Sequence, residues 1–130
     1  MKEIVEYQIL RACFHIRCEL GKTVTNAICN GWQLYGELQM CNDDLCQTMV
    51  KYGEKELQGD IKYYTTVTMY YDGREYLSDE DSEKFSRLVN EHIQMGYQPY
   101  GSLKMCIGEH FTGLSNGPIY HLAQAMVKYL

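Results

Sequence analysis

The sequence predicts an α+β protein made of duplicated strand-helix-strand-strand units, with antiparallel sheets, helices on one face of each sheet, and a pseudo-twofold axis between the units. Two repeated phrases carry this prediction. "GWQLYGELQMC" at residues 31–41 returns as "GYQPYGSLKMC" at 96–106, an offset of 65, and "QTMVKY" at 47–52 returns as "QAMVKY" at 124–129, an offset of 77. Self-similarity of this kind indicates an internal duplication.

The two offsets differ, so the second copy carries an insertion between its repeated phrases. We place the first unit at residues 1–60 and the second at 61–130, with an inserted loop at about 107–122. One such unit is small for independent stability. We therefore expect the two units to share one compact, pseudo-symmetric domain.

Each copy opens with a strand and continues with a helix. Residues 5–14 and 61–71 are rich in aromatic and β-branched side chains, which favours strands. The first helix is expected over 15–30 and the second from Ser78 or Asp79, and Gly31 and Gly96 are placed to end them. The predicted inner faces of the helices consist of Val24, Ala27 and Ile28 in the first and Phe85, Leu88, Val89, His92 and Ile93 in the second.

The first repeated phrase is the second strand of each unit, and a third strand, containing 49–52 or 126–129, returns antiparallel to it. Alternation places two sets of residues on a face that the helix should cover, Trp32, Leu34, Gly36, Leu38 and Met40, and Tyr97, Pro99, Gly101, Leu103 and Met105. The opposite face carries Gln33 and Tyr35 in the first copy and Gln98 and Tyr100 in the second. This Gln-x-Tyr face is left for solvent, the sister sheet, another subunit or a ligand.

Composition narrows the class of protein. Hydrophobic residues make up 45% of the chain and charged residues 22%, as in soluble globular proteins. The net charge of -5 and the absence of a basic cluster argue against a nucleic acid duplex as partner. No segment resembles a signal peptide or a membrane span, so we expect a cytoplasmic protein with six reduced cysteines and no membrane contact.

The repeated letters resemble a known family. A glycine ending a helix, then "WQLYG" or "YQPYG", and a closing "QxMVK" are similar to the bacterial and phage proteins grouped as domain of unknown function 1737, here in two tandem copies. The chain departs from the family pattern at Leu34, at Tyr97 and at the insertion. The resemblance implies a small α+β fold and supplies no activity.

The cysteines, histidines and glycines suggest three kinds of chemical site. A zinc site would need Cys41, Cys46, Cys106 and His110 to converge, and a thiol enzyme would use Cys106 with His110 or His121, but no catalytic phrase surrounds them. The glycines of "GEHFTGLSNG" fit no phosphate-binding fingerprint and lack its lysine. We therefore predict no catalytic residues, no metal and no cofactor.

Tyrosine is the most unusual component, with 12 residues in the chain. Tyrosine suits protein interfaces and the stacking of flat ligands. We predict a non-enzymatic binding or interaction protein, with a second copy or another protein as partner, that uses the Gln-x-Tyr face and the second-copy loop, through Gln33, Tyr35, Gln98, Tyr100, Phe111 and Asn116. The alternative is a sequestering protein, for example phage-borne, for an anionic nucleotide-like small molecule, with charge supplied by Arg11, Arg17, Arg74, Arg87 and Lys104.

Overall fold

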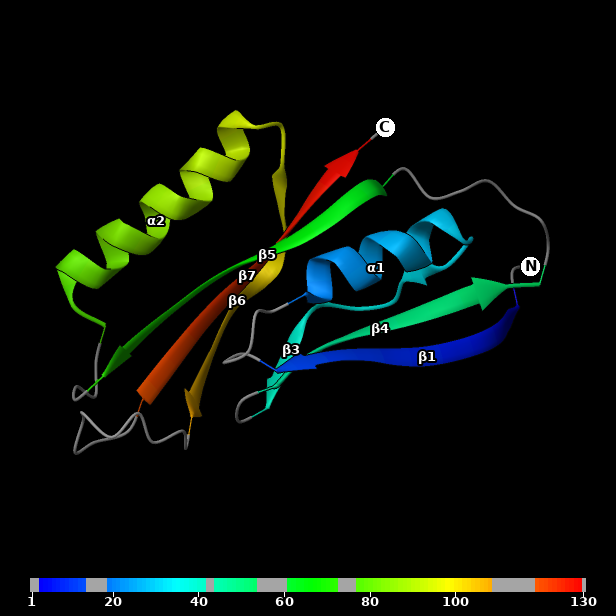
Figure 1. Cartoon of the computed structure of the whole chain (residues 1–130), viewed down its shortest axis with the longest axis horizontal. Coiled ribbons are helices and arrows are strands. Elements are labelled where there is room, and N and C mark those ends of the chain that lie inside the picture. Colours follow the sequence, from blue (N-terminus) through cyan, green and yellow to red (C-terminus); the bar gives the residue numbers. More distant parts are fainter. Residues whose placement is uncertain are drawn as a thin grey trace.

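The computed structural model describes residues 3–13, 19–41, 44–53, 61–72, 77–108 and 119–129. It shows an α+β fold with two antiparallel sheets (Figure 1). The elements in chain order are β1 (Ile4–Cys13), α1 (Leu20–Cys29), β2 (Gln33–Leu34), β3 (Gln39–Cys41), β4 (Asp44–Tyr52), β5 (Ile61–Asp72), α2 (Asp79–Gln94), β6 (Gln98–Gly108) and β7 (Ile119–Tyr129). Sheet A has the order β1-β4-β2, with β3 also paired to β4, and sheet B has the order β5-β7-β6.

The strand registers follow the two offsets found in the repeated letters. In sheet A, Met40 lies opposite Leu45 and Leu34 lies opposite Met49. In sheet B the residues 65 and 77 positions further on make the same pairs, Met105 with Leu122 and Pro99 with Met126. The predicted antiparallel return of the third strand is therefore confirmed in both sheets.

Both helices end at the predicted glycines, in the same way. Gly31 and Gly96 have φ angles of 93° and 98°, a region that glycine enters without strain. The amide after each glycine donates back into the helix, Trp32 to the Ala27 carbonyl and Tyr97 to the His92 carbonyl, each at 3.0 Å. These bonds, with those from the glycine amides, form the Schellman pattern that satisfies the last carbonyls of a helix.

The helix starts agree less evenly with the prediction. Ser78 caps α2 as expected, because its hydroxyl accepts a hydrogen bond from the Asp81 amide at 3.1 Å. The first helix was predicted from residue 15, but α1 begins at Leu20, and Glu19 in the cap position makes no side-chain capping bond. Residues 14–18 lie outside the described part of the chain.

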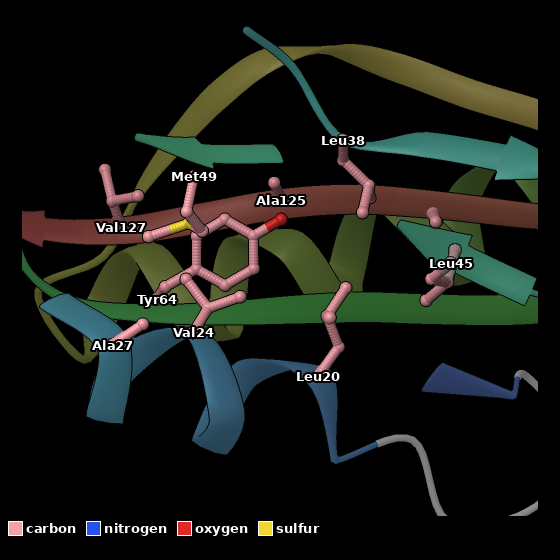
Figure 2. Close-up of a cluster of buried hydrophobic side chains, with 10 residues drawn as sticks. Leu20, Val24, Ala27, Leu38, Leu45, Met49, Tyr64, Ala125 and Val127 are labelled. Carbon is pink, nitrogen blue, oxygen red and sulfur yellow. The ribbon is translucent and has the colours of Figure 1, made fainter. Parts of the chain in front are cut away.

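Sheet B lies in the middle of the molecule, and different layers cover its two faces. On one face α2 packs over a cluster made of Val67, Met69, Tyr71, Phe85, Leu122 and Met126. The other face meets α1 and sheet A around a second cluster, in which Tyr64 lies close to Val24 of α1 and Met49 of β4 (Figure 2). The structure therefore has one continuous stack, with α1 lying between sheet A and β5 (Figure 1).

The helix α1 also closes an edge of sheet B. The Thr25 hydroxyl donates to the Tyr64 carbonyl and accepts from the Tyr64 amide, both at 3.1 Å. Gly21 permits this approach, since a Cβ there would lie 3.0 Å from both the Thr65 Cα and the Tyr64 carbonyl oxygen. At Tyr64 and Thr65 the outer edge of β5 is thus protected from pairing with another strand.

The predicted pseudo-twofold arrangement is not confirmed, because equivalent faces of the two sheets have different surroundings. Tyr7 and Tyr64 occupy the same register position, opposite Val50 and Val127. The side chain of Tyr64 is 2% exposed, whereas that of Tyr7 is 60% exposed. A twofold pairing of the units would give both residues the same environment.

Besides glycines, four residues that were predicted to lie under a helix are exposed, and the loop is shorter than predicted. Ile93 lies near the end of α2, and Pro99, Leu103 and Met105 lie on the edge strand β6, where the helix does not reach their side chains. The strand β6 continues to Gly108, and β7 already begins at Ile119. The ends of the range predicted as loop, 107–122, are therefore strand, and residues 109–118 are not described.

Candidate functional site

The strands of sheet A bring five predicted or newly identified residues onto one face. Residues directly opposite each other in an antiparallel ladder point to the same side of a sheet. Val50 lies opposite both Tyr7 and Gln33, and Ile9 lies opposite Thr48, whose carbonyl accepts a hydrogen bond from the Tyr35 amide at 3.0 Å. We call the side that carries Tyr7, Ile9, Arg11, Gln33 and Tyr35 the outer face of sheet A.

The outer face of sheet A exposes large apolar side chains. Tyr7, Ile9 and Tyr35 are 60%, 58% and 48% exposed, and Val5, at a bulge in the same strand, is 59% exposed. Isolated exposed apolar residues are ordinary, but a group of them on one sheet face marks an interaction surface. Leu10 and Ala12, the neighbours of Ile9 and Arg11 on the opposite side of β1, pack into the core.

The equivalent face of sheet B is covered by the rest of the chain. Tyr64, Ala125 and Val127 on this face are buried, and Tyr100 packs against them. Burial, with smaller contributions from Tyr129 and Glu37, raises the pKa of the Tyr100 hydroxyl above its ordinary value. Tyr100 thus belongs to the contact between the units.

The six predicted site residues therefore do not form one surface. Gln33 and Tyr35 lie on the outer face of sheet A, and Tyr100 lies in the contact between the units. Gln98 is exposed, and its amide donates to the Tyr97 carbonyl at 3.1 Å. Phe111 and Asn116 lie outside the described residues.

Two buried glutamines were missed as structural centres, although both stand in the repeated phrase "QxMVKY". The Gln47 side chain donates to the carbonyl of Gly36 and that of Gln124 to the carbonyl of Gly101, both at 3.1 Å. Each glycine has a positive φ at the irregularity in the edge of its sheet, between β2 and β3 in sheet A and within β6 in sheet B. The repeated Gln and Gly letters thus hold an irregularity of the strand at the same place in both sheets.

Gln47 also connects the two sheets. It is fully buried, and its side-chain oxygen accepts a hydrogen bond from the Tyr64 hydroxyl at 2.9 Å. This buried hydrogen bond links sheet A to sheet B in addition to the apolar contacts between them. It fixes the Tyr64 ring in the position seen in Figure 2.

A second connection between the sheets lies at the surface. The Glu37 carboxylate accepts hydrogen bonds from the Ser102 amide and from the Ser102 hydroxyl, the latter at 3.0 Å, and Lys104 Nζ lies 3.7 Å from it. The two Ser102 bonds, and then the Lys104 charge, hold the pKa of Glu37 below its ordinary value. This carboxylate is committed to the contact between the units.

A cavity of about 350 Å³ lies against the start of α1 and the edge of β5. Its lining is about equally polar and apolar, and the described residues that line it are Glu19, Gly21, Lys22, Thr25, Tyr64, Thr65, Thr66 and Tyr97. The cations that the sequence had suggested for an anionic ligand do not line it. Arg11 lies 3.8 Å from Asp44, Lys104 lies beside Glu37, and Arg17 and Arg74 are outside the described residues.

The cysteine-based sites weighed from the sequence differ in what the described residues show: Cys106 and His121 lie directly opposite each other in the β6–β7 ladder, whereas no metal-binding group is found. Within that part of the chain, no group of three or more His, Cys, Asp or Glu side chains is arranged to hold a metal ion. His121 lies in the strand opposite Cys106 and is fully buried, and His110 is not described. The helices in the described ranges include none with the length and apolar character needed to cross a membrane.

Comparison with known proteins gives no relative from which a role could be transferred. No protein-family model matches the chain, and no curated protein or solved structure matches it. The resemblance to the domain of unknown function 1737 family accordingly stays a prediction.

Proposed function

We propose that the chain is a non-enzymatic, cytoplasmic interaction protein whose binding surface is the outer face of sheet A. One observation carries this proposal: Tyr7 is open to solvent where its register equivalent, Tyr64, is buried. In sheet B, this face already forms a contact within the chain. In sheet A, the equivalent face is exposed, and we infer that a partner binds there.

The exposed side chains on this face are not needed to complete the core. Core packing against α1 uses the other side of sheet A, through Leu38, Leu45 and Met49. The apolar area of Tyr7 and Ile9 remains in contact with water, at a cost of roughly 25 cal/mol for each Å² left uncovered. A partner that covers this area gains that free energy on binding.

Site-specific photo-cross-linking in the producing cell tests this proposal. A benzophenone amino acid in place of Tyr7 should give a discrete covalent adduct, and the same group in place of Glu83, exposed on α2, should not. The adduct should disappear when Ile9→Lys is added to the chain, because the charge prevents burial of the face. Equal labelling from both positions, or an adduct that survives Ile9→Lys, would contradict the proposal.

The sequestering alternative retains one supporting feature, the cavity beside α1 with its hydroxyl groups and the Tyr97 ring. Lys22 is its sole cation, balanced by Glu19, so the cavity offers little attraction for an anion. A thermal-shift screen with nucleotides and cyclic nucleotides separates the two functions. A ligand that raises the melting temperature of the wild type but not of Lys22→Ala would favour sequestration.

A further inference from the structure

Three of the four sheet edges are covered or interrupted over at least part of their length. The edge of β5 is covered by α1 at Tyr64 and Thr65, where the Thr25 hydroxyl binds the Tyr64 backbone. The edge strand β6 contains Pro99 and Lys104 and is irregular around Gly101, and the edge opposite β1 consists of the two short strands β2 and β3. Prolines, lysines, bulges and short strands are the usual means by which proteins prevent edge pairing.

The fourth edge, that of β1, lacks these features along most of its length. The strand spans Ile4–Cys13 with neither proline nor lysine, and none of the described strands pairs with its outer side. Its single bulge lies near the start, between Ile4 and Glu6. From Glu6 onward β1 is a straight edge with exposed apolar residues.

The backbone of β1 directs hydrogen-bonding groups outward at known positions. The Thr48 carbonyl accepts from the Tyr35 amide, so the backbone of Thr48 faces away from β1. Ile9 lies directly opposite Thr48, and in an antiparallel ladder such a pair exchanges no hydrogen bonds. The N–H and C=O of Ile9 therefore point outward, and by alternation those of Tyr7 and Arg11 do as well.

We propose that β1 pairs with β1 of a second copy of the chain, antiparallel, across a twofold axis at Ile9. This inference rests on the proposed function and names its partner. The pairing uses the straight stretch after the bulge and brings Ile9 opposite the partner's Ile9. Tyr7 then lies opposite the partner's Arg11, whose guanidinium can stack on the phenol ring. Among the described residues, the ion pair of Arg11 is an exposed one with Asp44 at 3.8 Å, which contributes little to stability.

Neighbouring registers fit less well. An axis at Tyr7 or at Gln8 would bring Val5, at the bulge, into the ladder. An axis at Arg11 would oppose Arg11 to the partner's Arg11, and like charges directly opposite each other are destabilising. The Ile9 axis avoids both conflicts; an axis at Leu10 avoids them too, but it pairs Ile9 with the partner's Arg11 and so loses the Ile9 contact between the copies.

A second copy is not expected to cover the β1 edge with its α2, in the way that α1 covers β5. In α2 the positions 65 residues after Gly21 and Thr25 are Ser86 and Asn90. A Cβ at Gly21 would already lie 3.0 Å from the backbone of β5, so a serine prevents the same approach. The contact left to consider is direct pairing of the two β1 edges. Because this isologous contact uses the same edge of both copies, assembly stops at the dimer.

Sedimentation of the full chain over a wide concentration range tests the dimer. The wild type should show a concentration-dependent dimer, and Ile9→Pro should raise its dissociation constant at least about tenfold. Proline removes only an outward N–H, which an edge strand tolerates. Met105→Ser, at a residue similarly exposed on β6, should leave dimerisation unchanged. A wild type that stays monomeric at all concentrations overturns the proposal.

Disulfide trapping tests the register and does not depend on the proline variant. In a Cys29→Ser background, which removes an exposed thiol, Ile9→Cys should give a disulfide-linked dimer. Tyr7→Cys should not, because the two copies of that residue would lie about 14 Å apart. Equal trapping of both variants overturns the Ile9 axis. A monomer in sedimentation, together with a Tyr7 photo-adduct to a different protein, removes the second copy as partner but leaves the proposed function standing.

Discussion

Gln47 ties together three segments that lie far apart in the chain. It sits on β4, donates to the Gly36 carbonyl at the irregularity before β3, and accepts from the Tyr64 hydroxyl on β5. Replacing Gln47 with methionine keeps the volume and removes both bonds. We expect the free energy of unfolding to fall by about 2 kcal/mol, because buried polar groups lose their partners.

Urea denaturation measures this loss. Gln94→Met, at an exposed position at the end of α2, is the matched control and should leave the midpoint unchanged. A Gln47→Met protein as stable as the control would show that the buried bonds contribute nothing net.

Glu37 should make stability depend on pH in the acid range. Its pKa is lower in the folded protein than its ordinary value, because the Ser102 amide and hydroxyl and the Lys104 charge stabilise the carboxylate. The contribution is therefore complete above the unfolded pKa and is lost as pH falls through the folded pKa. Denaturation at neutral pH and near pH 3 should show that Glu37→Gln destabilises the protein less at the lower pH than at neutral pH.

The same experiment separates charge from packing as the source of stabilisation by Glu37. If wild type and Glu37→Gln differ in stability by the same amount at both pH values, the difference comes from packing and not from the carboxylate charge. An NMR titration of the Glu37 carboxyl group provides an independent readout of the same pKa.

At the level of single residues, the sequence showed which letters recur but not what each does. Gln47 and Gln124 recur in the closing phrase, and each alternates with Leu and Met on the core side of its strand, Leu45 and Met49 in sheet A. A glutamine between leucine and methionine at alternate positions of a strand was the feature of the sequence that indicated a buried polar residue. Its partners, glycine carbonyls on another strand, depend on tertiary pairing and could not be read from the letters.

Among the elements, helix ends were the most predictable features. Gly31, Gly96 and Ser78 act through contacts within a few residues of themselves, so local chemistry decides them. It was harder to predict which residues of a strand a helix would cover. Leu103 and Met105 alternate as core residues should, yet they lie on an edge strand that remains open. The reach of a helix over a sheet is a property of the assembled layers.

The approach of α1 to β5 gives a prediction with an unusual sign. Gly21→Ala should destabilise the protein by about 1 kcal/mol or more, although alanine favours a helix by about that amount over glycine. The reason is that the new Cβ would lie 3.0 Å from backbone atoms of Thr65 and Tyr64, which must move. Thermal or urea denaturation measures the change.

Asn26→Ala provides the control in the same helix. Asn26 is exposed, and its backbone carbonyl accepts a hydrogen bond from the Asn30 side chain. Alanine retains this carbonyl. This variant should be neutral or slightly stabilising. If Gly21→Ala behaves like the control, α1 can shift away from β5 without loss.

For the whole molecule, the sequence predicted two repeats and the antiparallel return of the last strand in each, but not the mutual arrangement of the repeats. Tyr7 and Tyr64 begin equivalent strands, and their surroundings differ because sheet A covers one and nothing described covers the other. Repeated letters are the same in both units, so they cannot say which copy of a face is buried. A symmetric pairing was the simplest assumption, and the layers instead follow one another in a stack.

The shared core predicts that neither unit folds alone. Without residues 1–53 the side chains of Tyr64, Ala125 and Val127 lose their cover, and without the second unit Leu20 and Val24 lose theirs. Fragments 1–60 and 61–130 should each lack a cooperative melting transition, and an equimolar mixture should recover one. Circular dichroism during heating measures this. A cooperative transition in either fragment alone would show that a unit is an independent domain.

The clasp of Thr25 on β5 also bears on protein synthesis. The segment "IKYYTTVTMYYD" that forms β5 has the high β-propensity and low charge of sequences that pair with neighbouring chains. The ribosome releases the α1 segment before β5, so Gly21 and Thr25 are already outside the ribosome when Tyr64 emerges. At Tyr64 the nascent strand can therefore pair with a segment of its own chain in competition with a neighbouring nascent chain on the same messenger RNA.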